Sequence, residues 1–271
     1  MAQAQGKYTK AKIEGFAAAL QQNVSVVCHG IRAQRYFHFD LNAGCGRNEI
    51  AMCDGSPIAF RAAACRARMP NALSFCCERD EVAAKRLAER CRDDHHTLVI
   101  NGRNQDVVEQ IPYIIREYGG DPKTAFGSIL LDPNDHNRDA IPYDELRVIS
   151  KKCPRLDVFF NFPQLAIKRV NGAVAKGRHA PEVARDCVDI DDLPEVIGKE
   201  HLWIAPQIGN FVLVVGRNTD NVNDDRNTGL HRWTSESGVW FRERCRMAVD
   251  EADKRHRERL SVASGQKLLF V

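Results

Sequence analysis

The sequence has no apolar run long enough to cross a membrane. Its longest apolar stretches lie around Phe211 to Val215 and Ile129 to Leu131, well below the roughly 18 residues that a membrane span needs. The polar start MAQAQGKYTK lacks the apolar core of a signal peptide. The formal net charge of +3 is too small to indicate nucleic-acid binding by itself. We therefore expect no membrane partner and a cytoplasmic location.

The sequence also lacks the cysteine patterns of zinc sites and of secreted disulfide frameworks. It contains 10 cysteines, but their spacings are irregular and no C-x-x-C pair occurs. Structural zinc sites need ligands at short regular spacing, and secreted frameworks need paired cysteines. We expect free thiols in a reducing compartment and no metal site.

Short apolar runs alternate with helix-forming segments between residues 36 and 163. Five such alternations are typical of a parallel sheet with helices on both faces. Two later runs, Leu202 to Ala205 and Phe211 to Val215, flank a short linker with a glycine and favour an antiparallel hairpin. The expected organisation is a helical segment at 1–35, an α/β domain at 36–217, and a loop with a charged helix at 218–271. For 1–35, a lid over a cofactor and simple packing are both open.

The stretch YFHFDLNAGCG joins the first β-like run to a glycine turn. It places Asp40 at the end of the run, followed by Asn42, Gly44 and Gly46. Glycine allows positive φ and leaves no Cβ in the way, so a nucleotide-type cofactor can lie against bare backbone at the end of the first strand. The pattern is not G-x-G-x-x-G, because Glu49 stands where the third glycine would be. A tight turn without a ligand is the alternative.

Acidic and amide side chains close the next three β-like runs. Glu78 ends the second run, where an acid can accept both hydroxyls of a bound ribose. Asn101 closes the third run, and Asp132, Pro133 and Asn134 follow the fourth. These residues form a candidate site at one edge of the sheet. For Asp132 and Pro133, a simple strand-ending turn is the alternative.

A basic segment without acids follows the fifth run, from Ile167 to Pro181. Two glycines favour a mobile loop on the side where substrates enter such folds. We expect this loop either to contact phosphates of a nucleic acid or to be simply solvated. The candidate nucleic-acid-binding residues are Lys168, Arg169, Lys176 and Arg178.

The order of these motifs resembles that of the three-Cys-motif partner proteins, methyltransferase-like proteins met in bacterial and mobile-element genomes. The shared pattern covers Tyr36 to Asn134 and includes FDLNAGCG, GSPIAF, the acid of CCERD, VINGRN and SILLDPND. The resemblance implies a Rossmann-like methyltransferase fold, with a mostly parallel seven-stranded sheet whose last strand inserts antiparallel. It implies S-adenosylmethionine as cofactor and a partner protein with three cysteines, of radical-SAM type. The residues that match the family motifs are Asp40, Asn42, Gly44 and Gly46 in the first, Glu78 as the ribose acid, and Asp132 with Pro133 in the fourth.

Two departures from methyltransferase motifs bear on function. Arg103 stands where an Asp near the adenine is usual, so Asn101 or Asn104 would have to make this contact. Amino-methyltransferases of DNA bases carry [DNS]-P-P-[FYW], whereas the segment 132–135 reads DPND and lacks the aromatic that stacks on a flipped base. We expect Phe162 or Trp233 to take that place.

Together these features predict an S-adenosylmethionine-dependent methyltransferase acting on a DNA or RNA base, with Asp132 orienting the accepting amine. Two alternatives are open. One is a non-catalytic subunit that keeps the fold and serves as scaffold or recognition partner of another protein. The other is a small-molecule methyltransferase, which the modest net charge favours.

Overall fold

The computed structural model describes residues 2–49, 51–133, 141–180, 188–206, 211–219 and 229–246. The main sheet consists of β1 (Arg35–Asp40), β4 (Asn71–Glu78), β5 (Thr97–Asn101), β6 (Gly127–Leu131), β7 (Leu156–Phe162), β8 (His201–Ile204), β9 (Val212–Arg217) and β10 (His231–Arg232). The α-helices are α1 (Ala2–Ser25), α2 (Ser56–Ala67), α3 (Glu81–Arg90), α4 (Asn104–Glu117), α5 (Tyr143–Lys152), α6 (Gln164–Ala175), α8 (Leu193–Ile197) and α9 (Glu236–Arg246). None of the helices in these ranges combines the length and apolarity of a membrane span.

The strand order of the sheet is β10-β8-β9-β7-β6-β1-β4-β5. Strands β5, β4, β1, β6 and β7 pair in parallel, and β9 lies antiparallel between β7 and β8. This is the order of the Rossmann-like methyltransferase fold, as the resemblance implied. The sheet has eight strands rather than the expected seven. The additional strand, β10, pairs with β8 through only two residues, too few to show a strand pattern in the sequence.

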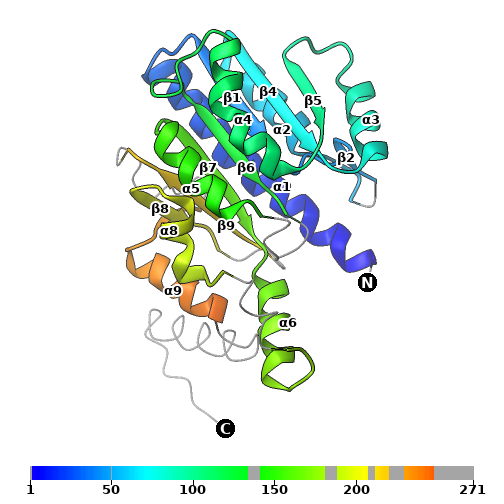
Figure 1. The fold of residues 1–271 in the computed structure, drawn as a ribbon, viewed down its shortest axis with the longest axis vertical. Coiled ribbons are helices and arrows are strands. Elements are labelled where there is room, and N and C mark those ends of the chain that lie inside the picture. The colour runs from blue at the N-terminus through cyan, green and yellow to red at the C-terminus, as the bar shows by residue number, and fades with distance from the viewer. Residues whose placement is uncertain are drawn as a thin grey trace, which may run out of the picture.

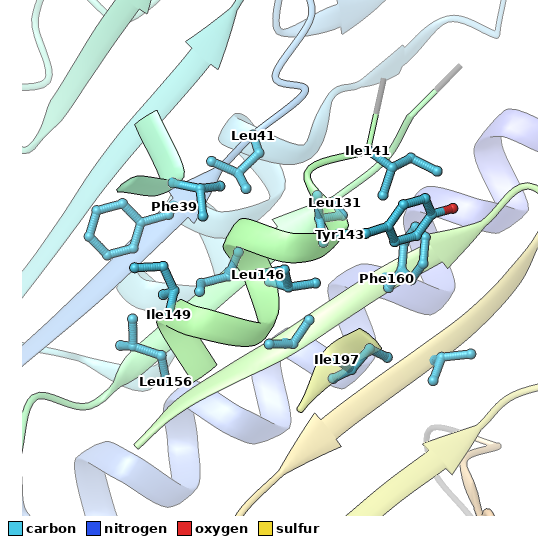
Figure 2. Packing of buried hydrophobic residues seen from close by; sticks show 14 of the residues in the cluster. Phe39, Leu41, Leu131, Ile141, Tyr143, Leu146, Ile149, Leu156, Phe160 and Ile197 are labelled. Carbon is cyan, nitrogen blue, oxygen red and sulfur yellow. The ribbon is translucent and has the colours of Figure 1, made fainter. Parts of the chain in front are cut away.

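Helices cover both faces of the sheet (Figure 1). On one face, side chains of β1, β6 and β7 pack with helices α4, α5 and α8 in the larger core cluster. Figure 2 shows this packing, in which Leu146 of α5 lies towards Leu131 of β6 and Ile149 lies towards Leu156 of β7. On the other face, α1 and α2 pack on alternate residues of the same strands. The central strands are therefore buried on both sides, which explains why apolar residues lie on both of their faces.

Helix α1 is part of this second core. Phe16, Leu20 and Val24 on one face of the helix are at most 1% exposed, and Phe16 makes an edge contact with the ring of Phe159, with centroids 5.9 Å apart. The apolar piece that follows continues as a short π-helical turn, Val26–Gly30. Much of the segment 1–35 thus packs on the sheet, although its Lys12 also reaches the candidate site described below.

A predicted loop after the fifth strand is in fact helical. The basic segment expected to be a loop from Ile167 onward forms most of α6, up to Ala175. Ile167 and Val170 of this helix are only 6% and 9% exposed, so an apolar stripe three residues apart anchors it to the protein. The prediction of a mobile loop was wrong for these residues, because burial of this apolar stripe stabilises the helix by more than Gly172 destabilises it.

The cysteines of the described residues are free thiols, as predicted. Cys76, Cys77, Cys91 and Cys153 are at most 7% exposed and pack as small apolar side chains. The segment between the glycine turn and Ser56 contains a small separate sheet, β2 (Arg47–Asn48) and β3 (Cys53–Asp54).

A polar network is buried between α1 and the sheet. The hydroxyl of Tyr36 donates to Asn23, and the Asn23 amide donates to the carboxylate of Asp157. Arg217 of β9 completes the network, with its Nε 2.8 Å from Asp157 Oδ2. Its guanidinium also lies over the ring of Trp203, 5.4 Å from the ring centroid. Buried charges of this kind are tolerated only when they are paired.

Candidate cofactor site

The candidate site lies where the strand order reverses. Strand β1 has β4 on one side and β6 on the other, and helix α2 connects β1 to β4. In open α/β sheets, ligands bind at the carboxyl ends of the strands at such a switch point. The predicted residues Asp40, Glu78 and Asp132 come at the carboxyl ends of β1, β4 and β6.

The glycine turn after β1 has the conformation that its sequence requires. Gly44 and Gly46 have φ of +61° and +77°. A Cβ on Gly46 would lie 2.7 Å from Leu87 Cδ1, so Gly46 allows the turn to approach α3 closely. Nothing lies within 4 Å of the Cβ position of Gly44. The open space at Gly44 leaves its backbone accessible to a ligand.

Glu78 ties the glycine turn to the end of β4. Its Oε2 accepts a hydrogen bond from the Gly44 backbone N–H at 2.8 Å, and its Oε1 accepts one from the Asp80 N–H at 2.8 Å. A carboxylate has about four lone-pair positions, so these bonds fix its orientation and leave acceptor capacity. Glu78 therefore lies beside the glycine turn, as predicted, and keeps acceptor capacity for hydroxyl groups of a ligand.

Asp40 is fully buried and only partly satisfied. Its Oδ1 accepts from the Asn42 N–H at 3.3 Å, and the Ser56 side chain also bonds the carboxyl. Gly55 takes the N-cap position of α2, so Ser56 is the first residue of that helix. Burial, with the nearby charges of Asp132 and Glu78, raises the pKa of Asp40 to about 7. Its Oδ2 is buried without a hydrogen-bond partner.

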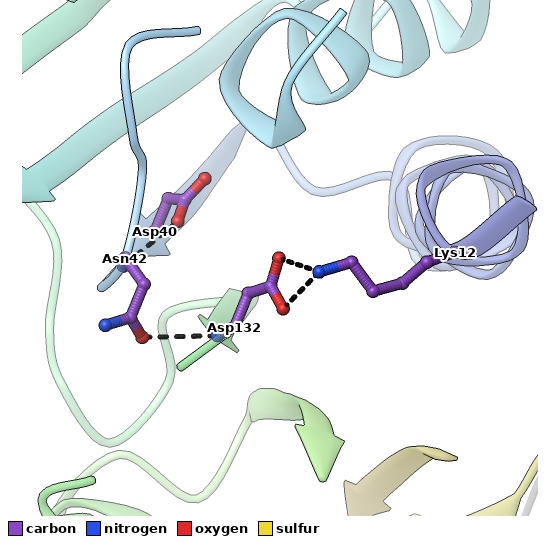
Figure 3. Close-up of polar contacts among 4 residues, drawn as sticks. All are labelled: Lys12, Asp40, Asn42 and Asp132. Carbon is purple, nitrogen blue, oxygen red and sulfur yellow. Dashed lines mark hydrogen bonds and ion pairs between the residues drawn. The ribbon is translucent and has the colours of Figure 1, made fainter. Parts of the chain in front are cut away.

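Asp132 forms an ion pair with Lys12 of α1 (Figure 3). The Lys12 ammonium donates to both carboxylate oxygens of Asp132 at 2.8 Å, and it lies 4.3 Å from the ring centroid of Phe211. The backbone N–H of Asp132 donates to Asn42 Oδ1 at 3.2 Å. Sequence reasoning found Asp132 and Asn42 but missed Lys12 and Phe211, because no local pattern links them to the motif.

The remaining residues at the β5 end lie as follows. The Asn101 amide donates to the backbone carbonyls of Glu78 and Arg79, at 2.9 and 3.2 Å. The Arg103 guanidinium forms an ion pair with Asp106 of α4, with its Nη2 2.8 Å from Oδ1. Asn104 is 7% exposed. Asn101 therefore braces the turn that carries Glu78, and its carbonyl oxygen is the group that it can offer to an adenine.

The residues proposed for substrate contact are only partly brought to the site. Pro133 is buried beside Asp132, and Asn134 lies outside the described residues. Phe162 and Trp233 are 1% and 9% exposed and belong to the core. Because core packing holds both rings, the expectation that either stacks on a flipped base was wrong.

The basic residues after β7 differ in how far their side chains are exposed to solvent. Lys168 donates to the backbone carbonyl of Arg244 at 3.3 Å, and partial burial lowers its pKa. Arg169, Lys176 and Arg178 are exposed on α6 and the turn that follows it. In Figure 1, α6 extends beyond the carboxyl end of β7. The last three side chains are therefore available to a ligand such as a phosphate.

The site fits an organic cation. Asp40, Glu78 and Asp132 place negative charge around a turn of bare backbone, and Asp40 has an unpaired buried oxygen. A positively charged group would offset the cost of the buried Asp40 carboxylate. No group of three or more His, Cys, Asp or Glu side chains in the described ranges could hold a metal ion. S-adenosylmethionine, which carries a sulfonium and an ammonium group, matches this donor set.

Comparisons with known proteins do not show a family for this chain. No protein-family model and no curated protein matches the chain. Among solved structures it is similar to the protein LPL1258 of Legionella pneumophila, with 12% identity, a TM-score of 0.45, and 75% of this chain and 85% of that chain covered. An rRNA methylase from Streptococcus thermophilus matches with 12% identity and a TM-score of 0.35 over 69% of this chain and 89% of that chain.

A third similar structure is WbdD, with 10% identity and a TM-score of 0.44 over 73% of this chain. The chain spans only 38% of the length of WbdD. Likeness at this level carries no argument about function. The strand order of the sheet is what shows that this chain has an α/β, Rossmann-like methyltransferase fold.

Proposed function

We propose that this chain binds S-adenosylmethionine at the carboxyl ends of β1 and β4 and transfers its methyl group to an amino group of a nucleic acid base. The observation that carries the proposal is the grouping of Asp40, Glu78 and Asp132 around an open glycine turn at the switch point. The methyltransferase strand order supports it.

Different residues of the site would bind different parts of the cofactor. Gly44 and Gly46 leave room for it against the backbone, and Glu78 accepts the ribose hydroxyls. Asp40 faces its cationic end, where the unpaired Oδ2 gains a partner. When bound, S-adenosylmethionine supplies a methyl group activated by the sulfonium, so the protein has mainly to align the acceptor and exclude water.

Asp132 would hold the accepting amine. The backbone at Asp132 is held in place, because its N–H donates a hydrogen bond to Asn42 Oδ1. In this position the carboxylate can accept hydrogen bonds from an amino group and take up the proton that the amine releases after transfer. Alignment of the nitrogen with the methyl group is its main contribution.

Asp132→Asn is expected to lower the turnover number by about 10²–10⁴-fold, with affinity for S-adenosylmethionine nearly unchanged. The measurement is transfer of labelled methyl groups to DNA, RNA and small primary amines. Asp106→Asn is the matched control, because the Asp106 side chain is 58% exposed on α4. Full turnover of Asp132→Asn on the true acceptor would show that Asp132 has no role in transfer.

The nucleic-acid part of the proposal is supported by the basic residues of α6 and its following turn. Arg169, Lys176 and Arg178 are exposed beyond the carboxyl end of β7. Contacts of this kind to phosphates weaken as salt rises, because bound counterions are released. Affinity for nucleic acid that is independent of salt would remove this part and favour a small-molecule acceptor.

A second candidate function is that of a non-catalytic subunit. The Lys12 ammonium occupies both oxygens of Asp132, as expected if the acceptor position is closed. The resemblance to three-Cys-motif partner proteins would then direct attention to a protein partner of radical-SAM type. A subunit of this kind would bind the cofactor without turning it over, alone or with nucleic acid.

A further inference from the structure

The Lys12 ammonium lies in a small site made of a carboxylate and an aromatic ring. Its Nζ is 2.8 Å from each oxygen of Asp132 and 4.3 Å from the ring centroid of Phe211. The Lys12 and Asp132 side chains are only 11% and 14% exposed. An ammonium withdrawn this far from water needs close partners to offset the loss of hydration. The Asp132 carboxylate and the Phe211 ring therefore form a site that suits an ammonium group.

The chemistry of the site selects amino groups. Two carboxylate oxygens accept two N–H hydrogens from one nitrogen, whereas a hydroxyl donates only one. The face of the Phe211 ring attracts positive charge, and the negative charge of Asp132 repels carboxylates and phosphates. An alkylammonium or the exocyclic amine of a base thus meets the requirements of Asp132 and Phe211.

This amine site is connected to the cofactor turn through Asn42. Asn42 Oδ1 accepts the backbone N–H of Asp132 at 3.2 Å, and the Asn42 N–H donates to Asp40 Oδ1 at 3.3 Å. Figure 3 shows Asp40, Asn42 and Asp132 in this sequence, with Lys12 approaching from α1. A methyl acceptor has to lie next to the cofactor, and Asn42 links Asp132 directly to the turn that is proposed to hold the cofactor.

Lys12 can leave this position without unpacking its helix. The anchors of α1, among them Phe16 and Leu20, lie one turn and more beyond Lys12 and are at most 1% exposed. The lysine stem is long and flexible. A rotation of this side chain would free both oxygens of Asp132 while α1 stays packed on the sheet.

We propose that Lys12 is a built-in occupant of the acceptor subsite. Its ammonium marks the place of the amino group of the acceptor, and the acceptor displaces it. This inference rests on the proposed function and deepens it, because it places the accepting amino group between the Asp132 carboxylate and the Phe211 ring. It also assigns to Phe211 the aromatic role that the sequence left to Phe162 or Trp233.

The test is an NMR titration of the full chain with n-butylammonium chloride, an analogue of the lysine side chain. Lys12→Ala is expected to bind this amine about tenfold or more tightly than the wild type, because the occupant no longer competes. In Lys12→Arg the arginine is expected to keep the place beside Asp132, so the affinity for n-butylammonium should not rise above that of the wild type. Butan-1-ol is expected not to bind. Lys10→Ala is the matched control, since the Lys10 side chain is 64% exposed on the same helix.

Equal affinity of wild type and Lys12→Ala for n-butylammonium, or equal binding of butan-1-ol, would overturn the inference. In the double variant Lys12→Ala/Asp132→Asn the gain in affinity is expected to disappear, and its persistence would contradict the assigned site. The titration needs neither cofactor nor turnover. Failure here with intact binding of S-adenosylmethionine therefore overturns the inference and leaves the proposed function standing. Failure to bind S-adenosylmethionine overturns the proposed function, and with it the role of the amine site as a methyl-acceptor subsite.

Discussion

Arg217→Met is expected to lower the free energy of unfolding by about 3–5 kcal/mol, because it leaves a buried carboxylate without its ionic partner. Arg217 Nε lies 2.8 Å from Asp157 Oδ2, and the two side chains are 3% and 14% exposed. Asn23 donates to the same carboxylate oxygen, so this neutral hydrogen bond would remain, together with the charge of Lys199, which also lowers the pKa of Asp157. The measurement is denaturant unfolding of the wild type and the variant near neutral pH.

The loss of stability in Arg217→Met should depend on pH with a defined sign. Burial raises the pKa of Asp157 even beside Arg217, and removal of the arginine raises it further. The folded variant then holds a proton that the unfolded chain releases above the ordinary pKa of about 4. Its stability is therefore greatest below that pKa and falls as pH rises. The difference from the wild type is expected to shrink between pH 7 and pH 5.

The control for this prediction is Arg103→Met. Arg103 also forms an ion pair, with Asp106 at 2.8 Å, but the two side chains are 68% and 58% exposed. Exposed pairs contribute at most about 1 kcal/mol. An Arg217→Met variant no less stable than this control would show that the buried network does not depend on the ion pair.

Gly127→Ala is expected to cost about 3 kcal/mol or more, because the sheet has no room for a methyl group there. Gly127 begins β6 and pairs with Phe37 of β1 and Leu156 of β7. A Cβ would overlap the Phe37 carbonyl oxygen and lie 2.8 Å from Leu156 Cδ2. The substitution would push β6 away from β1, and thermal and denaturant unfolding would measure the effect.

Gly172→Ala is the matched control for Gly127→Ala. Gly172 lies within α6, and nothing lies within 4 Å of its Cβ position. Alanine in an open helical position is expected to raise the stability by up to about 1 kcal/mol. Similar changes for the two substitutions would contradict the account of how β6 is packed.

The central strands could be predicted because burial on both faces leaves a mark in the sequence. Tyr36, Phe37, Phe39 and Leu41 are at most 1% exposed, so the run carries apolar residues on both faces of the strand rather than on one face alone. Strand β10 could not be predicted, since its two residues are held by pairing with β8 rather than by any pattern of their own. Its position depends on where the chain returns after β9.

Part of the site could be predicted because parallel strands end at a common edge. Asp40, Glu78 and Asp132 each follow an apolar run, and the fold brings them together. Lys12 lies 120 residues from its partner Asp132 in the sequence. Its contact depends on how α1 docks on the sheet, which no short motif encodes. The contact between Phe211 and Lys12 likewise joins two distant parts of the sequence.

The central claim, a cofactor site between the glycine turn and Glu78, is tested most directly by calorimetric titration with S-adenosylmethionine and S-adenosylhomocysteine. We predict micromolar binding to the wild type, weakened about 100-fold in Glu78→Ala because charged hydrogen bonds to the ribose are lost. Glu81→Ala, which removes a side chain that is 68% exposed, should bind like the wild type. No binding to the wild type, or unchanged affinity in a folded Glu78→Ala variant, would contradict this account.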